Sequence, residues 1–197
     1  MWLNQFLNSP PHPSIEDAAR ELQKKFLAER ASIFILDKNK IVVTISLRTP
    51  IMLVETDKIR YLTKSGAIYG EAEKPETENL PVLSGIFSQR ETPFQFLPDN
   101  SLELREDEKT LVSEAIQLLN ISRNKGFDLI KIGYIIYRGF SMILEENQTE
   151  IIIGRSPFST SIDRLGHILI KLKEKGSIAA RIELDYNGKA FIKEKNL

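Results

Sequence analysis

Apolar and polar positions along the chain recur with two different periods, and these periods predict its secondary structure. Three segments carry apolar residues at helical spacing, and they span about 15–27, 106–123 and 159–175. Shorter runs rich in β-branched residues predict strands, at 31–37, 41–47, 52–55, 59–63, 67–69, 127–137, 140–144, 149–153, 178–185 and 189–194. Helices interspersed among mostly antiparallel hairpins predict an α+β fold.

Capping and breaking residues set the limits of several elements. Ser14 is an N-cap residue, with Asp17 as the acid of a capping box, and Gly126 takes the position after the last helical turn of the second helix. Pro50 breaks the strand before it, because proline cannot donate to a ladder. Residues 80–85 form a short apolar segment, and 86–104 are expected to be irregular.

The final hairpin is the feature that points most directly to function. Its two strands, 178–185 and 189–194, are joined at Asn187-Gly188 and end almost at the C-terminus. A terminal hairpin predicts a sheet edge. Such an edge can accept a strand from another protein, so the sequence favours a binding protein.

Composition and charge exclude several other functions. Lys+Arg and Asp+Glu both number 27, and a nucleic-acid protein would have a basic excess. The chain has no cysteine, which excludes disulfides and cysteine-based zinc sites. No apolar stretch approaches the roughly 20 residues of a membrane span, and the first seven residues are too short and lack the basic residues of a signal peptide.

Chemistry-bearing residues do not form a catalytic or metal-binding pattern. The only histidines, His12 and His167, have no ligand spacing around them. Ser159 and Ser161 near Asp163 fit a helix start rather than a nucleophile, and the paired acids lie in polar turns and caps where they stay solvated. We therefore expect no enzymatic activity, no catalytic residue, no metal and no cofactor.

Five segments in order resemble one protein family, the bacterial cell-division proteins FtsQ/DivIB. The resemblance covers about the whole chain. Each motif alone is weak, and their joint order, with helices in the correct gaps, is what makes the resemblance specific. The segments are a strand ending in Arg-Thr-Pro at 42–50, an apolar segment with Ser-Gly at 61–69, Leu-Pro-Val-Leu-Ser-Gly at 80–85, a hairpin ending in Gly-Arg at 140–155, and Glu-Leu-Asp-Tyr-Asn-Gly at 183–188.

The resemblance implies an extracytoplasmic POTRA module followed by a β domain. A partial POTRA module would span 14–55 and a mixed or antiparallel β domain with two helices would span 56–197. Only the last helix and two strands of the family's βααββ pattern are present, so we expect the chain to be truncated or its start to be placed too late. At Leu47, Phe140 and Asp185 the chain departs from the residues that are common in the family.

The implied function is a non-enzymatic scaffold that binds FtsB- and FtsL-like partners at the division septum, on the periplasmic side of the inner membrane. The membrane anchor would lie in a segment absent from this chain. The residues expected to bind the partners belong to the final hairpin and to one basic position: Tyr186, Gly188, Lys189, Ala190, Phe191 and Arg138.

Other interpretations of these residues stay open. Tyr186 could be a core or rim tyrosine beside the turn, and Arg138 could pair with Glu145, Glu150 or Glu183 within the chain. The chain could also be a POTRA-type binding module of an outer-membrane assembly or secretion system, although tandem βααββ repeats would then be expected. A hydrolase acting on the cell envelope would need a perturbed acid or a metal.

Overall fold

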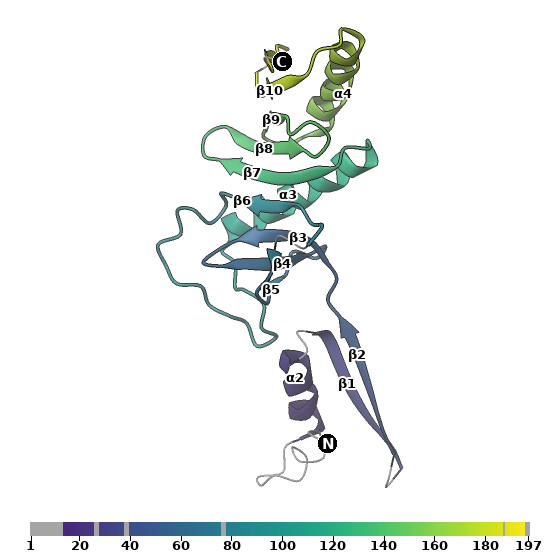
Figure 1. Cartoon of the computed structure of the whole chain (residues 1–197). Helices are drawn as coiled ribbons and strands as arrows, with labels where there is room; N and C mark the ends of the chain where they lie inside the picture. The colour runs from purple at the N-terminus through teal and green to yellow at the C-terminus, as the bar shows by residue number, and fades with distance from the viewer. Residues whose placement is uncertain (1–13, 26–27, 38–39, 76–77, 187, 196–197) are drawn as a thin grey trace.

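The computed structural model describes residues 14–25, 28–37, 40–75, 78–186 and 188–195, which form an α+β structure with two sheets (Figure 1). The helices are α2 (Ile15–Lys25), α3 (Glu106–Asn124) and α4 (Ser159–Glu174). The strands are β1 (Ala28–Asp37), β2 (Lys40–Leu47), β3 (Pro50–Glu55), β4 (Ile59–Thr63), β5 (Ile68–Tyr69), β6 (Val82–Ser84), β7 (Leu129–Ile135), β8 (Gly139–Leu144), β9 (Glu150–Gly154), β10 (Ala179–Glu183) and β11 (Phe191–Glu194).

Nine strands form one mixed sheet in the order β11-β10-β9-β8-β7-β6-β3-β4-β5. The pairs β9–β10, β6–β7 and β3–β6 are parallel, and the other neighbours are antiparallel. The sheet therefore runs from the C-terminal hairpin at one edge to the short strand β5 at the other. The expected α+β fold with a mixed β domain is confirmed.

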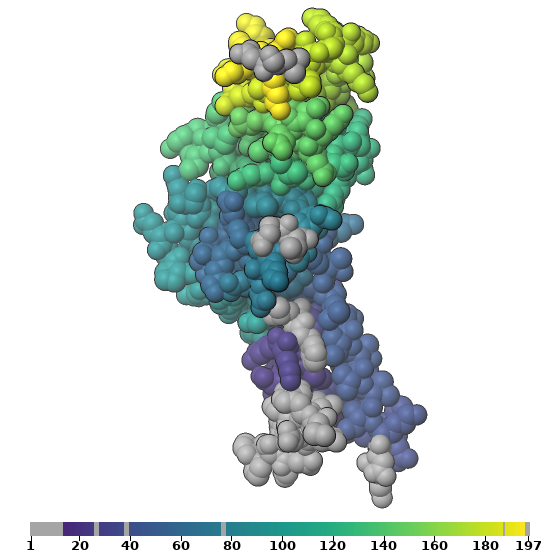
Figure 2. All heavy atoms as spheres, in the orientation of Figure 1, coloured from purple at the N-terminus to yellow at the C-terminus, as the bar shows by residue number. Residues whose placement is uncertain are grey.

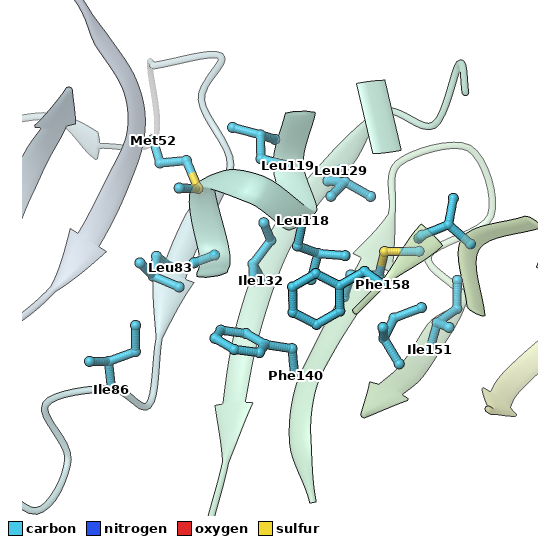
Figure 3. Packing of buried hydrophobic residues seen from close by; sticks show 14 of the residues in the cluster. Met52, Leu83, Ile86, Leu118, Leu119, Leu129, Ile132, Phe140, Ile151 and Phe158 are labelled. Atoms are coloured by element: carbon cyan, nitrogen blue, oxygen red, sulfur yellow. The ribbon is translucent and has the colours of Figure 1, made fainter. Parts of the chain in front are cut away.

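Helices α3 and α4 are the crossovers of two parallel strand pairs, β6–β7 and β9–β10. In both cases the chain passes from one strand to its parallel neighbour on the side of the β11 edge. Because such connections are right-handed, both helices lie on the same face of the sheet. One apolar cluster unites the helices with the strands below them. At its centre the rings of Phe140 and Phe158 meet edge to face, 5.6 Å apart, beside Leu118 and Ile132 (Figure 3).

The helix ends follow the capping residues that the sequence predicts. The Ser14 hydroxyl accepts the Asp17 N–H, and the Asp17 carboxylate accepts the Ser14 N–H, which completes the capping box. Gly126 adopts a φ of +77°, and its N–H together with that of Phe127 bonds the last carbonyls of α3 in a Schellman motif. These predicted helix limits are confirmed.

The N-terminal part forms a separate small unit that projects beyond the large sheet (Figures 1 and 2). Helix α2 packs on the β1–β2 hairpin through a small cluster around Ala18, Leu22 and Ile33. The break between the two sheets comes at residues 48–49, because β3 pairs with β4 and β6 in the large sheet. Thus β3, which the expected module 14–55 includes, belongs to the sheet of the second unit.

Some predicted elements differ from the observed ones. Residues 82–84, expected only as part of a short apolar segment, form the central strand β6, because the segment is apolar enough to lie between β3 and β7. Strands β7, β10 and β11 are shorter than predicted. Phe26 and Leu27, predicted in the first helix, and Asn187, predicted in the final turn, lie outside the described residues.

Candidate partner-binding surface

Strand β11 forms one edge of the nine-stranded sheet, and all four of its residues are exposed. It pairs antiparallel with β10, with Ile192 opposite Ile182. The N–H of Lys195 bonds the Ile178 carbonyl at 2.8 Å. Since alternate residues of an antiparallel strand bond the same neighbour, Ile192 and Glu194 direct their backbone N–H and C=O groups away from β10, toward the free edge.

Two aromatic side chains lie together at the start of this edge. The rings of Tyr186 and Phe191 meet edge to face with their centroids 4.9 Å apart. They remain 47% and 54% exposed, respectively. Aromatic residues are enriched among the anchors of protein interfaces. A paired and exposed arrangement therefore fits the predicted anchor, and Tyr186 is not a core tyrosine.

The other predicted hairpin residues lie in the turn that joins β10 to β11. Gly188 has a φ of +68° and is exposed, as are Lys189 and Ala190. The Lys189 carbonyl accepts a hydrogen bond from the Arg164 guanidinium of α4 at 2.7 Å. This contact fixes the turn against α4.

Arg138 is engaged in hydrogen bonds within the chain. It lies in the β7–β8 turn and donates to the carboxylates of Glu183 and Asp185, at 2.8 Å and 2.9 Å. The bond to Glu183 is the main reason that the Arg138 pKa is raised, and the same bond lowers the pKa of Glu183. The intramolecular alternative with Glu183 is therefore the observed one, and Arg138 holds the β7–β8 turn beside the end of β10, next to the turn of the final hairpin.

Tyr137, the residue before Arg138, is a candidate that the sequence analysis missed. Its side chain is 91% exposed, and its backbone has a φ of +68°, which is uncommon for a bulky residue. Because Arg138 bonds Asp185, and Tyr186 follows Asp185 in the chain, the β7–β8 turn lies next to the aromatic pair. The sequence contains a signal for this position. Tyr137 is an aromatic residue between two predicted strands, and Gly139 follows two residues later.

These residues together define the corner surface: Tyr137, Arg138, Tyr186, Phe191 and the outer edge of β11. It combines unpaired backbone groups with exposed rings and with the ion pairs of Arg138 to Glu183 and Asp185. Such a surface can bind an extended segment by backbone hydrogen bonds, with pockets or rings that select side chains.

A cleft lies elsewhere, at one end of the two crossover helices. This cleft of about 790 Å³ opens between the C-terminal ends of α3 and α4 and the β8–β9 turn. Its acidic residues Asp128, Glu145 and Glu146 are exposed to water. Among the residues that the structure describes, no cluster of three His, Cys, Asp or Glu side chains could hold a metal ion.

Comparisons with known proteins point to cell division. No model of a known protein family matches the chain. Among curated proteins, it is 22% identical over 160 residues to the cell division protein FtsQ of Geotalea daltonii. The aligned region covers 79% of this chain but 54% of that protein, so the chain spans about half the length of its curated relative. This distant similarity supports an FtsQ-like relationship.

The described helices also bear on membrane association. None of them is both long enough and apolar enough to cross a bilayer.

Proposed function

We propose that this chain is a non-enzymatic scaffold of the FtsQ/DivIB type that binds FtsB- and FtsL-like proteins during cell division. The observation that supports this most is the open edge of β11, with the Tyr186–Phe191 pair at its start. The distant similarity to FtsQ supplies the biological setting. The site of action would be the extracytoplasmic, periplasmic side of the inner membrane at the division septum.

The binding mode is β-augmentation along β11. The partner strand would bond the outward backbone groups of Ile192 and Glu194, and these bonds would supply most of the affinity. Tyr186 and Phe191 would contact side chains of the partner, with Tyr137 at the rim of the same surface. Arg138 would act indirectly, by keeping the β7–β8 turn and the hairpin together.

A titration with a single variant tests this function. The purified chain is titrated with the extracytoplasmic segments of the FtsB–FtsL-type pair from the same organism, beside Tyr186→Glu. We expect the variant to stay folded, because Tyr186 is exposed, and to bind at least about 30-fold more weakly, as loss of an interface anchor does.

The matched control is Tyr186→Phe, which keeps the ring that packs edge to face with Phe191. This control is expected to bind close to the level of the unaltered chain. Equal affinity of the unaltered chain and Tyr186→Glu would remove Tyr186 from the site. A lack of binding by the unaltered chain would contradict the proposed function.

A further inference from the structure

The cleft between the ends of α3 and α4 lies at the opposite end of β7 and β8 from the corner surface. These two strands meet in the β7–β8 turn at one end and reach the cleft at the other, where the Glu145 N–H bonds the Asp128 carbonyl at 2.9 Å. The Thr149 hydroxyl bonds the Ala179 carbonyl at 2.8 Å. These bonds join the start of β7, the β8–β9 turn and the start of β10, so the residues that line the cleft are held together.

Apolar side chains line this cleft, and some of them are in contact with water. Leu144 and Leu172 are buried, whereas Phe127 and Leu169 are half-buried. Ile170 of α4 exposes 58% of its surface. The volume of about 790 Å³ lies within the range of ligand-binding clefts. An apolar side chain of a bound molecule would therefore gain free energy by covering these residues.

Negative charge predominates among the side chains of the cleft. Three exposed carboxylates belong to its lining, those of Asp128, Glu145 and Glu146. None of the three forms an ion pair with another described residue. Lys125 also belongs to the lining, but its ammonium group pairs with Asp163 at 2.8 Å. Lys173 is the other cation, so the described lining has more free carboxylates than free ammonium groups.

Both crossover helices end at this cleft, and their ends add to the negative potential. The last carbonyls of α3 accept the N–H groups of Gly126 and Phe127, and those of α4 accept the N–H groups of Gly176 and Ser177. All four of these residues line the cleft. The C-terminal end of a helix carries about half an elementary negative charge. The helix ends and the carboxylates therefore favour the same ligand charge, a positive one.

From the apolar lining and the negative charge we propose that this cleft binds a basic amphipathic segment of a partner protein, in which Lys or Arg residues flank an apolar side chain. The apolar side chain packs on Leu169 and Ile170, and the flanking cations pair with the exposed carboxylates. A nucleic acid or an anionic lipid surface would meet like charges here. This binding does not depend on the proposed function, because it uses neither β11 nor the corner surface.

The test uses two short synthetic peptides with leucine at the same positions, one with lysine and the other with glutamate at the flanking positions. Each peptide is titrated into the isotope-labelled full chain, and binding is followed by NMR. We expect the lysine peptide to shift the amide signals of Gly126, Glu146 and Gly176, with a Kd of about 100 μM or lower. The glutamate peptide should leave these signals unchanged.

Removal of two carboxylates from the cleft should weaken the binding of the lysine peptide. For the double variant Glu145→Gln and Glu146→Gln we expect about fivefold weaker binding, since both side chains are exposed. The matched control is the double variant Glu91→Gln and Glu103→Gln, which removes two exposed acids from the loop before α3. This loop lies at the other end of that helix, about 28 Å away. The control should bind like the unaltered chain.

Two results would overturn the proposal. The first is a lysine peptide that shifts none of the cleft signals at concentrations up to about 1 mM. The second is equal weakening of binding in the cleft variant and the control variant, since only the net charge of the chain would then matter. Binding of the FtsB–FtsL-type segments should be the same in the cleft variant and the unaltered chain, so this proposal and the proposed function can fail separately.

Discussion

The two edges of the nine-stranded sheet differ in exposure: one is covered by other parts of the chain and the other is exposed. Strand β5 at one edge has two residues, Ile68 and Tyr69, which are 0% and 5% exposed. The loop before α3 covers it, since the Leu102 N–H bonds the Ile68 carbonyl at 2.7 Å. Strand β11 at the other edge is entirely exposed. Among the described strands of this sheet, β11 is therefore the edge at which a strand of another protein could pair.

Arg48 contributes to the closure of the β5 edge. Its guanidinium lies 5.0 Å above the Tyr69 ring and bonds the Asp99 carboxylate at 2.7 Å, with a side chain that is 3% exposed. Burial is the main reason that the Tyr69 pKa is raised. No comparable cover lies over β11 among the described residues, although Arg138 and Arg164 fix the turn end of the hairpin and Lys195 bonds the Asn147 carbonyl at its other end.

The largest expected effect comes from closing the open edge. Ile192→Pro removes an outward N–H and places a ring at the edge, while the bonds between β10 and β11 remain. We expect binding of the FtsB–FtsL-type segments to weaken by about a hundredfold or more, roughly 3 kcal/mol. Isothermal titration calorimetry measures this effect.

The control for this change is Ile192→Ala, which keeps the N–H and should retain most of the affinity. Thermal unfolding of Ile192→Pro should stay close to that of the unaltered chain. Unchanged affinity of the proline variant would mean that the partner does not pair with β11.

Opening the closed edge should affect stability and leave binding unchanged. Arg48→Met removes a buried ion pair and the contact with the Tyr69 ring, and we expect unfolding to become about 1–2 kcal/mol easier. Denaturant titration measures the loss, and exposed Arg155→Met is the control, with a change within about 0.5 kcal/mol. Weaker partner binding by Arg48→Met would show that the two edges are coupled.

A substitution at Tyr137 should have a smaller effect, which weakens binding without lowering stability. Tyr137→Asn removes the exposed ring but suits a φ of +68° at least as well. Binding should weaken by about fivefold, near 1 kcal/mol, while the free energy of unfolding stays equal or rises slightly. Tyr137→Phe should bind normally. A loss of stability in Tyr137→Asn without loss of affinity would give Tyr137 a structural role only.

The smallest effect concerns the contact between Arg138 and Glu183. Because the Glu183 pKa is lowered in the folded chain, its contribution to stability is present above the ordinary value of 4.5 and is lost as the pH falls through the folded value. The pair is partly exposed, so the contribution is about 0.5 kcal/mol. In Arg138→Gln, the free energy of unfolding should fall less as the pH drops below 4.5. An identical fall in the variant and the unaltered chain would mean that the Arg138–Glu183 contact is not its cause.

Local signals in the sequence predicted much of the fold. Ser14 and Gly126 mark the observed helix ends, and Pro50 marks the observed start of β3. Capping, a left-handed turn and the missing N–H of a proline depend on neighbouring residues, so the local sequence can predict them. Strand β6 was not predicted as a strand, because three residues at 82–84 have no usable period and their pairing with β3 and β7 is set by distant parts of the chain.

The same distinction applies to the candidate site. The final hairpin could be predicted, since its two strands are adjacent in sequence. Arg138 could not be assigned, because its partners Glu183 and Asp185 follow by 45 and 47 residues and meet it only when β7 to β10 are assembled. The exposure of Tyr137 depends on the same assembly.

The most direct test of the open β11 edge is backbone hydrogen exchange by NMR, with and without the FtsB–FtsL-type segments. The amides of Ile192 and Glu194 point away from β10, so they should exchange rapidly in the free chain and become protected in the complex. The amides of Ile68 and Tyr69 should not change. Binding without added protection at Ile192 and Glu194 would contradict strand pairing at β11.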